Sequence, residues 1–246
     1  MAGDGLIEKV SSLLAERGNA VALTGAGISV ESDIPAFRGA QGLWEKYDPM
    51  EFADIEGFIR RPERSWLMLS ELIAICEKAS PNAAHYVLAE LESKGLLKSV
   101  ITQNVDGLHQ AAGTRKVIEY HGNMDELVCI FCWKSYPTKK HWKNNDISPR
   151  CDCGEILKPN IVMFGEPIPR LARESAEEEA RNCAALLVIG TSALVSPACE
   201  IPRIAKKSGA VVVEINTENT WLTDSLTDIY IQGTASEVLV KLLKLL

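Results

Sequence analysis

The sequence predicts an α/β fold in which a parallel sheet carries helices on both of its faces. Residues 185–190 and 210–216 are continuous apolar runs that end in polar residues, which is typical of strands buried on both faces. A third apolar run, residues 20–23, leads into Gly25 and Gly27, as a strand does when it feeds a phosphate-binding loop. Helical segments between such runs favour a Rossmann-like sheet.

The first and last segments both carry helix signals. Residues 6–17 place apolar side chains three and four positions apart, the pattern of an amphipathic helix, and Gly18 ends it. Thr234 and Glu237 have the spacing of a capping box, so they predict the start of the final helix.

A helix and a strand are also expected in the middle of the chain. Ser80 followed by Pro81 predicts a helix start, with serine as the N-cap and proline in the first helical position. Gly95 ends this helix, and residues 99–102 form the next strand.

Two stretches interrupt the alternation of strands and helices. One is rich in loops and then helical, and the other contains clustered cysteines with too few apolar residues to fold alone. We therefore predict a helical insertion and a small metal-bound module within one Rossmann-like domain. That domain comprises residues 1–34, 80–123 and 158–246, the helical insertion residues 35–79, and the metal-bound module residues 124–157.

Four of the seven cysteines form two close pairs, Cys129 with Cys132 and Cys151 with Cys153. Two thiol pairs about twenty residues apart match a tetrahedral structural zinc site, and a redox dithiol is the alternative. Because sulfur fills all four positions, such a zinc ion has no place for water or substrate and is not catalytic. Clustered thiols are also more typical of a reducing compartment than of disulfides.

The charge balance excludes several classes of partner. With 26 basic and 33 acidic residues the formal net charge is −7, so we expect no direct contact with nucleic acid. The first residues lack the basic start and apolar core of a signal peptide, and no stretch approaches the ~20 apolar residues of a membrane span. We expect a cytoplasmic monomer without membrane contact.

Polar segments follow several of the predicted strands. Residues 102–109 combine amide, carboxylate and imidazole groups, residues 190–198 supply small hydroxyl side chains, and residues 216–217 end a third strand. In an open parallel sheet, ligands bind beyond the carboxyl ends of the strands. The first glycine loop has Val30 where the dinucleotide fingerprint has its third glycine, which indicates a nucleotide site of another form.

Six short motifs and the four cysteines occur in the order found in sirtuins. The motifs are GAGIS at 25–29, IPAFRG at 34–39, TQNVDGLH at 102–109, HGN at 121–123, VMFGE at 162–166 and GTS at 190–192. Over essentially its whole length the chain resembles this family, the NAD-dependent protein lysine deacylases of the silent-information-regulator type. The resemblance implies that NAD is consumed as a substrate, and that the loop after GAGIS turns aside to wrap the nicotinamide ribose.

The resemblance implies a set of NAD contacts at the strand ends. The residues implied near the pyrophosphate and in the adjoining loop are Gly25, Ala26, Gly27, Ser29, Phe37 and Arg38. Those implied near nicotinamide and its ribose are Gln103, Asn104 and Asp106. Those implied on the phosphate and adenosine side are Gly190, Thr191, Ser192, Asn216 and Ala235.

The resemblance also implies that His121, Asn104 and Asp106 are catalytic. In the family's reaction the acyl oxygen of the modified lysine attacks the ribose C1′ as nicotinamide departs, and a carboxylate such as Asp106 suits the developing positive charge. Neutral His121 then accepts a proton from a ribose hydroxyl, as an imidazole with a pKa of about 6.5 can do near neutral pH. The implied products are nicotinamide, the free lysine and O-acetyl-ADP-ribose.

An acyl-lysine protein or peptide is the implied partner. Val162 and Phe164 are implied in the wall of the acyl-lysine tunnel. Gly165 and Glu166 are implied in pairing with the substrate backbone as an added strand.

The acyl group itself is predicted from one helical segment. In the branch that removes succinyl and malonyl groups, a tyrosine and an arginine lie three and six residues after a tryptophan. Counting from Trp66, this chain has Leu69 and Leu72 at those positions. A free carboxylate against two leucines loses hydration without gaining a partner. We therefore expect activity on acetyl-lysine and longer aliphatic acyl-lysines, with succinyl-lysine disfavoured.

Two residues differ from the family pattern, and two alternative functions share the same NAD site. Asp33 stands where the family usually has glycine, and Ala36 where it usually has Asp or Thr, so both bear on the loop of the NAD site. One alternative is transfer of ADP-ribose to protein or to water, as an ADP-ribosyltransferase or NAD glycohydrolase. The other is a non-catalytic NAD-sensing zinc scaffold. The presence of Asn104, Asp106 and His121 favours the deacylase.

Overall fold

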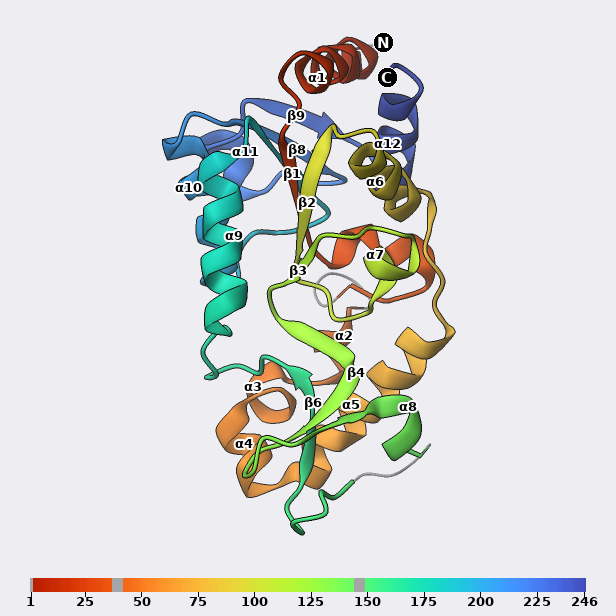
Figure 1. Ribbon diagram of the computed structural model, residues 1–246, viewed down its shortest axis with the longest axis vertical. Coiled ribbons are helices and arrows are strands. Elements are labelled where there is room, and N and C mark those ends of the chain that lie inside the picture. Colours follow the sequence, from red (N-terminus) through yellow and green to blue (C-terminus); the bar gives the residue numbers. More distant parts are fainter. Residues whose placement is uncertain (1, 37–41, 144–148) are drawn as a thin grey trace.

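The computed structural model describes residues 2–36, 42–143 and 149–246, which form a larger and a smaller region stacked along the long axis (Figure 1). The larger region is built on a six-stranded sheet in which all neighbouring strands pair in parallel. In spatial order the strands are β3 (Val117–Glu119), β2 (Leu97–Thr102), β1 (Ala20–Thr24), β7 (Ala185–Ile189), β8 (Val211–Asn216) and β9 (Ile229–Gln232). This sheet confirms the predicted α/β fold.

Helices cover both faces of the sheet, because successive side chains of a strand point to opposite faces. On one face Ala20 and Ala22 of β1 belong to a core formed with α1 (Ala2–Arg17), α6 (Ala83–Ser93) and α12 (Ala235–Leu243). These three helices lie together at one end of the molecule, close to both chain termini (Figure 1).

The opposite face carries a second core. Val21 and Leu23 of β1 pack there with residues from α9 (Arg170–Asn182), α10 (Ile201–Lys207) and α11 (Trp221–Ser225). Both faces of β1 are therefore fully buried, which explains why its sequence is a continuous apolar run.

The strand order reverses beside β1. Strands β2 and β3 lie on one side of it, and β7, β8 and β9 lie on the other. Such a switch point opens a crevice at the carboxyl ends of the strands, where α/β proteins bind ligands. Short helices occupy the loops at these ends: η1 (Ala26–Ile28), η2 (Val30–Ser32), α7 (Leu108–Ala111) and η3 (Ala198–Glu200).

One predicted helix start is wrong. The helix expected from Ser80 and Pro81 begins at Ala83, with Asn82 as its N-cap. The physical reason is a tertiary contact, because the Asn82 side chain also donates to the Ile28 carbonyl at 2.7 Å and so joins the helix to the first glycine loop. By contrast, Thr234 is the N-cap of α12 as predicted.

The smaller region combines helices with an antiparallel sheet. Its helices are α2 (Leu43–Lys46), α3 (Pro49–Phe52), α4 (Ile55–Arg60), α5 (Pro62–Lys78) and α8 (Thr138–His141). Its sheet has the order β5 (Ser135–Pro137), β4 (Gly122–Cys129), β6 (Leu157–Ile161).

One hydrophobic core joins these elements, although they come from two distant parts of the sequence. Trp66 of α5 is fully buried in it, and its Nε1 donates to the Leu157 carbonyl at 3.0 Å. The cysteine-containing segment therefore gains from α5 the apolar surface that it lacks by itself.

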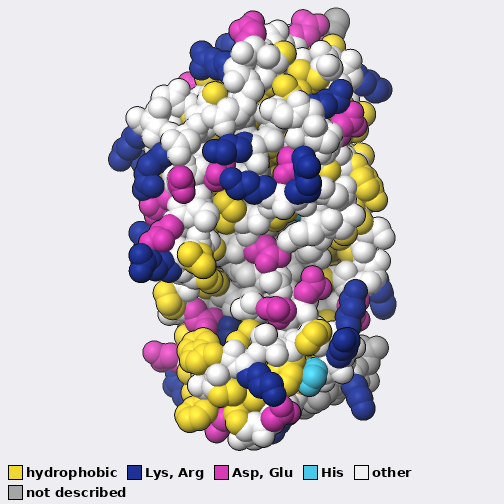
Figure 2. All heavy atoms as spheres, in the orientation of Figure 1, with side chains coloured by type: hydrophobic (Ala, Val, Ile, Leu, Met, Phe, Trp, Pro, Cys, Tyr) yellow, Lys and Arg dark blue, Asp and Glu magenta, His cyan; other side chains and the backbone are white. Residues whose placement is uncertain are grey.

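Charged side chains of both signs are interspersed over the face drawn in Figure 2, whereas hydrophobic ones gather at the lower end, over α3, α4 and the small sheet. The exposed large hydrophobic residues of those segments are Met50, Ile59, Phe131 and Trp133. Across the described parts of the chain, no helix combines the length and the apolar character needed to cross a bilayer.

Candidate active site and zinc site

A cavity of about 760 Å³ lies at the carboxyl ends of β1, β2, β7 and β8 and continues between the two regions. It brings together most of the residues singled out from the sequence. Those that line it are Gly25, Ala26, Gly27, Leu72, Gln103, Asn104, His121, Val162, Phe164, Gly165, Glu166, Gly190, Thr191, Ser192, Asn216 and Ala235. Ser29, Asp106 and Leu69 are described but do not line it, and Phe37 and Arg38 lie outside the described residues.

Two glycine loops touch at the base of the cavity. The Gly27 amide donates to the Gly190 carbonyl at 2.8 Å, so the loops after β1 and β7 are in direct backbone contact. A Cβ on Gly27 would lie 2.7 Å from the Gly190 Cα, which is closer than any side chain permits. The glycines are therefore required for the two loops to close the site.

Asn104 is held in place from behind the cavity wall. Its Nδ2 donates to the Gly25 carbonyl and to Ser29 Oγ, both at 3.1 Å. Ser29 Oγ in turn donates to Asp106 Oδ2 at 2.7 Å, and the other carboxylate oxygen accepts the Leu108 amide at 2.9 Å. Asp106 and Ser29 thus orient Asn104 through a continuous chain of hydrogen bonds.

Thr191 accepts hydrogen bonds from Gln103 and Asn216 and so links three strand ends. Its Nε2 donates to Thr191 Oγ1 at 3.0 Å, and the Asn216 side chain donates to the Thr191 carbonyl at 3.0 Å. Amide and hydroxyl groups from β2, β7 and β8 therefore meet on one wall, where they can bind the hydroxyls and phosphates of a nucleotide.

His121 lies between β3 and β4 and faces the cavity. Its Nδ1 is 3.1 Å from the Gln103 carbonyl oxygen, which can only accept, so Nδ1 carries the proton. Nε2 is then left as an acceptor. Burial lowers the pKa of His121 below its usual value, which favours the neutral imidazole near pH 7.

Two other histidines are buried away from the cavity. The rings of His85 and His109 lie 4.9 Å apart, and His109 Nε2 is 3.0 Å from Thr24 Oγ1. Burial lowers the pKa of His85 to about 4 and that of His109 to about 3, so both are neutral near pH 7.

The backbone conformation of Asp33, which follows η2, shows why this position tolerates a residue other than the family's usual glycine. Asp33 has a φ of 62°, in the left-handed region that favours glycine and that Asp adopts more readily than most residues. Ala36, the other departure, lines the cavity.

The apolar wall of the cavity corrects one prediction. Leu69 is fully buried in the core of the smaller region and does not face the cavity. Met68 takes that place, because it lies four residues before Leu72 and shares its face of α5. The apolar lining residues to which the sequence analysis gave no role include Trp44, Met68, Val105, Ile161, Met163, Ile168, Leu194 and Val195. Val105, Met163, Leu194 and Val195 lie within segments that the sequence analysis singled out for other residues. The remaining four, Trp44, Met68, Ile161 and Ile168, come from separate elements that no motif marks.

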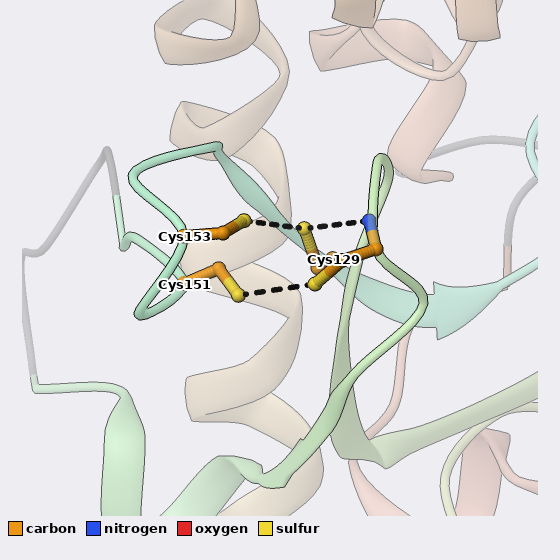
Figure 3. A group of neighbouring side chains, drawn as sticks. Cys129, Cys151 and Cys153 are labelled. Atoms are coloured by element: carbon orange, nitrogen blue, oxygen red, sulfur yellow. Dashed lines mark hydrogen bonds between the residues drawn. The ribbon is translucent and has the colours of Figure 1, made fainter.

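The four clustered cysteines converge in the small sheet. Figure 3 shows the sulfurs of Cys151 and Cys153 pointing toward the turn that carries Cys129. All four sulfurs lie within 4.8 Å of one another, and two of the separations are 3.6 Å (Cys129 to Cys153) and 3.5 Å (Cys132 to Cys151). A tetrahedral zinc ion with Zn–S bonds of about 2.3 Å separates its sulfurs by about 3.8 Å. The cluster therefore fits a structural zinc site.

The fold and these two sites define an α/β protein with a nucleotide cavity and a separate four-cysteine module. A sequence model described as the Sir2 family matches residues 25–197, and the chain belongs to this family. It is 48% identical to NAD-dependent protein deacylase 2 of Archaeoglobus fulgidus, over 97% of this chain and 95% of that one. It is 46% identical to the NAD-dependent protein deacylase of Pyrococcus abyssi, over 95% of each chain.

Solved structures of Sir2 proteins agree with the fold. A Sir2 homologue in complex with NAD has a TM-score of 0.90 and 42% identity, covering 96% of this chain and 92% of that one. A Sir2 protein with a deacetylated p53 peptide and 3′-O-acetyl-ADP-ribose has a TM-score of 0.92 and 38% identity, covering 97% of each. Sir2Af2 with a myristoylated histone peptide has a TM-score of 0.83 and 41% identity, covering 98% and 96%.

Proposed function

We propose that this chain is an NAD-dependent protein lysine deacylase that transfers the acyl group to ADP-ribose and releases nicotinamide and O-acyl-ADP-ribose. The observation that carries the proposal is the position of His121. Its Nε2 is free to accept a proton, and it lies on the same cavity as the first glycine loop and the 162–166 segment. A nucleotide and an acyl-lysine peptide can thus meet beside one neutral imidazole.

The donor set of the cavity suits NAD. The loops around Gly27 and Gly190 approach each other closely, and amide groups stand at the ends of two strands, Gln103 and Asn104 after β2 and Asn216 at the end of β8. Bound NAD supplies an ADP-ribosyl group from which nicotinamide departs. In our proposal Asn104, oriented by Ser29 and Asp106, holds the nicotinamide end. The hydroxyl-rich loop after β7 holds the phosphates.

We assign to His121 the role of general base. The Gln103 carbonyl fixes the ring and keeps its proton on Nδ1. The lowered pKa leaves Nε2 available to take a proton from a ribose hydroxyl near neutral pH. The four cysteines hold a zinc ion outside this cavity, where it stabilises the small sheet and takes no part in the reaction.

The acyl group is proposed to be uncharged. Met68, Leu72 and Val105 contribute to an apolar wall, and none of the cavity-lining residues that the structure describes is a lysine or an arginine. A carboxylate would be desolvated there without a charged partner. This supports acetyl-lysine and longer aliphatic acyl-lysines as substrates, and the myristoylated peptide bound to Sir2Af2 is in keeping with it.

A cytoplasmic location and a monomeric state belong to the same proposal. Four thiols kept reduced for a metal are typical of a reducing compartment.

To test the proposal, the protein is incubated with NAD and with peptides that carry acetyl-, hexanoyl-, myristoyl- or succinyl-lysine. Mass spectrometry then identifies both products. We expect free lysine and O-acyl-ADP-ribose from the three uncharged acyl groups. ADP-ribose attached to the peptide, or free ADP-ribose alone, would instead indicate a transferase or a glycohydrolase.

A further inference from the structure

Lys158 and Glu166 form an ion pair whose side chains are only 9% and 24% exposed; Lys158 lies within β6, and Glu166 ends the turn that leads from β6 into the cavity. We propose that this pair is a clamp that positions the 161–166 segment, and with it the binding edge for the acyl-lysine peptide, against His121. The inference rests on the proposed function for the identity of the ligand, whereas the clamp itself is a property of the chain.

The clamp closes the segment with three hydrogen bonds. Lys158 Nζ donates to the Ile161 carbonyl at 2.5 Å and to Glu166 Oε2 at 2.8 Å. The same carboxylate oxygen accepts the Met163 amide at 2.8 Å. One lysine and one glutamate thus fix the start, the middle and the end of a six-residue turn. Gly165, with a φ of 86°, lets the chain double back so that Glu166 can reach.

The clamped segment is joined to the proposed general base. The Val162 amide donates to the His121 carbonyl at 2.9 Å, so the two residues share a backbone contact. On the other side the Phe164 amide donates to the Ala53 carbonyl at 2.8 Å, and the Phe164 carbonyl accepts the Ile55 amide at 3.0 Å. A shift of the segment would therefore move both the peptide edge and the wall beside His121.

An ion pair that is buried on its lysine side and partly buried on its glutamate side needs a reason other than stability. Desolvation of two charges offsets most of their attraction, and well-packed apolar residues often stabilise a fold equally well. Here the pair places its donors and acceptors on backbone groups that no apolar side chain could hold. Those backbone groups belong to a turn whose residues line the cavity. Positioning of the turn accounts for the pair.

Loss of the clamp is expected to affect peptide binding and not NAD binding. Its hydrogen bonds lie within residues 158–166, away from the loops after β1, β7 and β8 that are proposed to hold NAD. Loss of the clamp should weaken peptide binding and leave NAD binding intact. A purely structural role would instead lower thermal stability and affect both ligands alike.

The test uses Lys158→Met (K158M), which keeps the length of the side chain and removes its charge. K158R is the conservative variant, and E166Q and K158M/E166Q complete a double-mutant cycle. K206M is the matched control, since it breaks the ion pair between Lys206 of α10 and Asp228, which directly precedes β9, and neither residue lines the cavity. For each protein we measure the KM for acetyl-lysine peptide, the Kd for NAD without peptide, and hydrogen exchange of the Val162, Met163 and Phe164 amides.

We expect K158M to raise the peptide KM by between about tenfold and about a hundredfold, as for other misplaced binding groups. Its Kd for NAD should stay within about twofold of the wild type, and exchange of the three amides should accelerate. K158R should recover most of the peptide affinity, and the double variant should be no worse than the poorer single variant. K206M should match the wild type.

Unchanged amide exchange in K158M, or equal losses for NAD and peptide, would overturn the clamp. If K158M does not fold, K158R and E166Q carry the same comparison. If the wild type turns over no acyl-lysine peptide, the proposed function fails, and amide exchange still decides whether the clamp exists.

Discussion

The Nδ1 of His121 lies 3.1 Å from the carbonyl oxygen of Gln103, two residues that are eighteen positions apart in the sequence. This contact fixes the tautomer of the imidazole, because a carbonyl oxygen cannot donate. Gln103 in turn reaches Thr191, so the proposed base is tied to the ends of β2 and β7. The position of His121 therefore depends on the same strand ends that are proposed to bind NAD.

Replacing His121 with alanine should abolish deacylation while NAD still binds. The variant loses the group that accepts the ribose proton, which costs roughly 10²- to 10⁴-fold in turnover. Steady-state deacylation and NAD affinity by calorimetry check this, with H141N at an exposed site as the control. Near-normal turnover of H121A would show that another group is the base.

Asn104→Ala and Asp106→Asn should both suppress nicotinamide exchange. Asn104 lies on the cavity wall and Asp106 supports it through Ser29, so both act before any step at His121. We expect the larger loss for N104A, and for S29A a smaller loss of about tenfold, the effect of removing the two hydrogen bonds that Ser29 Oγ makes with Asn104 and Asp106. Exchange of labelled nicotinamide into NAD measures the effect. Wild-type exchange rates in N104A and D106N would contradict the assignment.

Removal of zinc should lower thermal stability and activity together. The four sulfurs hold the small sheet, which shares its core with α5 and lies next to the clamped turn. Metal binding to such a module is part of its folding free energy. C151S should behave like chelated wild type in a thermal melt, whereas C199S, outside the cluster, should not. Elemental analysis that finds no zinc in the purified protein would refute the site.

Stability should fall as the pH drops from about 6.5 toward 4. The folded protein holds His85 and His109 neutral, with pKa values lowered to about 4 and about 3, while the unfolded chain takes up protons near pH 6.5. The unfolded state therefore binds more protons in this window, and each histidine contributes up to about 1.4 kcal/mol per pH unit. Below pH 4 their contribution levels off as they protonate in the folded state.

Urea unfolding at several pH values measures this slope. H109Q keeps an amide that can bond Thr24 and removes one titrating ring, so its slope should be about half that of the wild type. A wild-type stability that is flat between pH 6.5 and 4.5 would contradict the neutral buried pair.

Leu72→Arg should shift the acyl preference toward succinyl-lysine. The substitution places a guanidinium on the apolar wall, where it can pair with a free carboxylate. We expect the ratio of succinyl to acetyl turnover to rise about tenfold or more, as one charge-assisted pair allows. L69R is a matched comparison, because Leu69 lies in the core and its replacement should destabilise the protein without improving succinyl turnover. An unchanged ratio in L72R would remove Leu72 from the acyl wall.

The strands of the central sheet were the most predictable part of the fold. The runs at 185–190 and 210–216 correspond to β7 and β8 to within one residue, because strands buried on both faces are continuous apolar runs. The edge strands β3 and β9 and the three strands of the small sheet were not predicted; β3 and β5, with three residues each, carry no periodic signal. The start of α6 was misplaced because Asn82 bonds to Ile28, a contact that no local pattern announces.

The candidate site was predictable where a motif names a backbone loop or a pair of thiols. The cysteine spacing alone indicated a cluster, and the structure brings all four sulfurs together. The sequence did not reveal that Ser29 and Asp106 lie behind Asn104, because their roles depend on hydrogen bonds between separate loops. The Lys158–Glu166 pair was missed for the same reason: its function lies in the turn that it closes.

The fate of the acetyl group separates deacylation from transfer of ADP-ribose to protein or to water. Wild-type protein is incubated with NAD and a peptide that carries ¹³C-acetyl-lysine, and mass spectrometry follows the label. We expect the label on ADP-ribose, with nicotinamide and free lysine formed in equal amounts. Label that remains on the peptide while nicotinamide accumulates, or that is released as acetate with NAD intact, would contradict it.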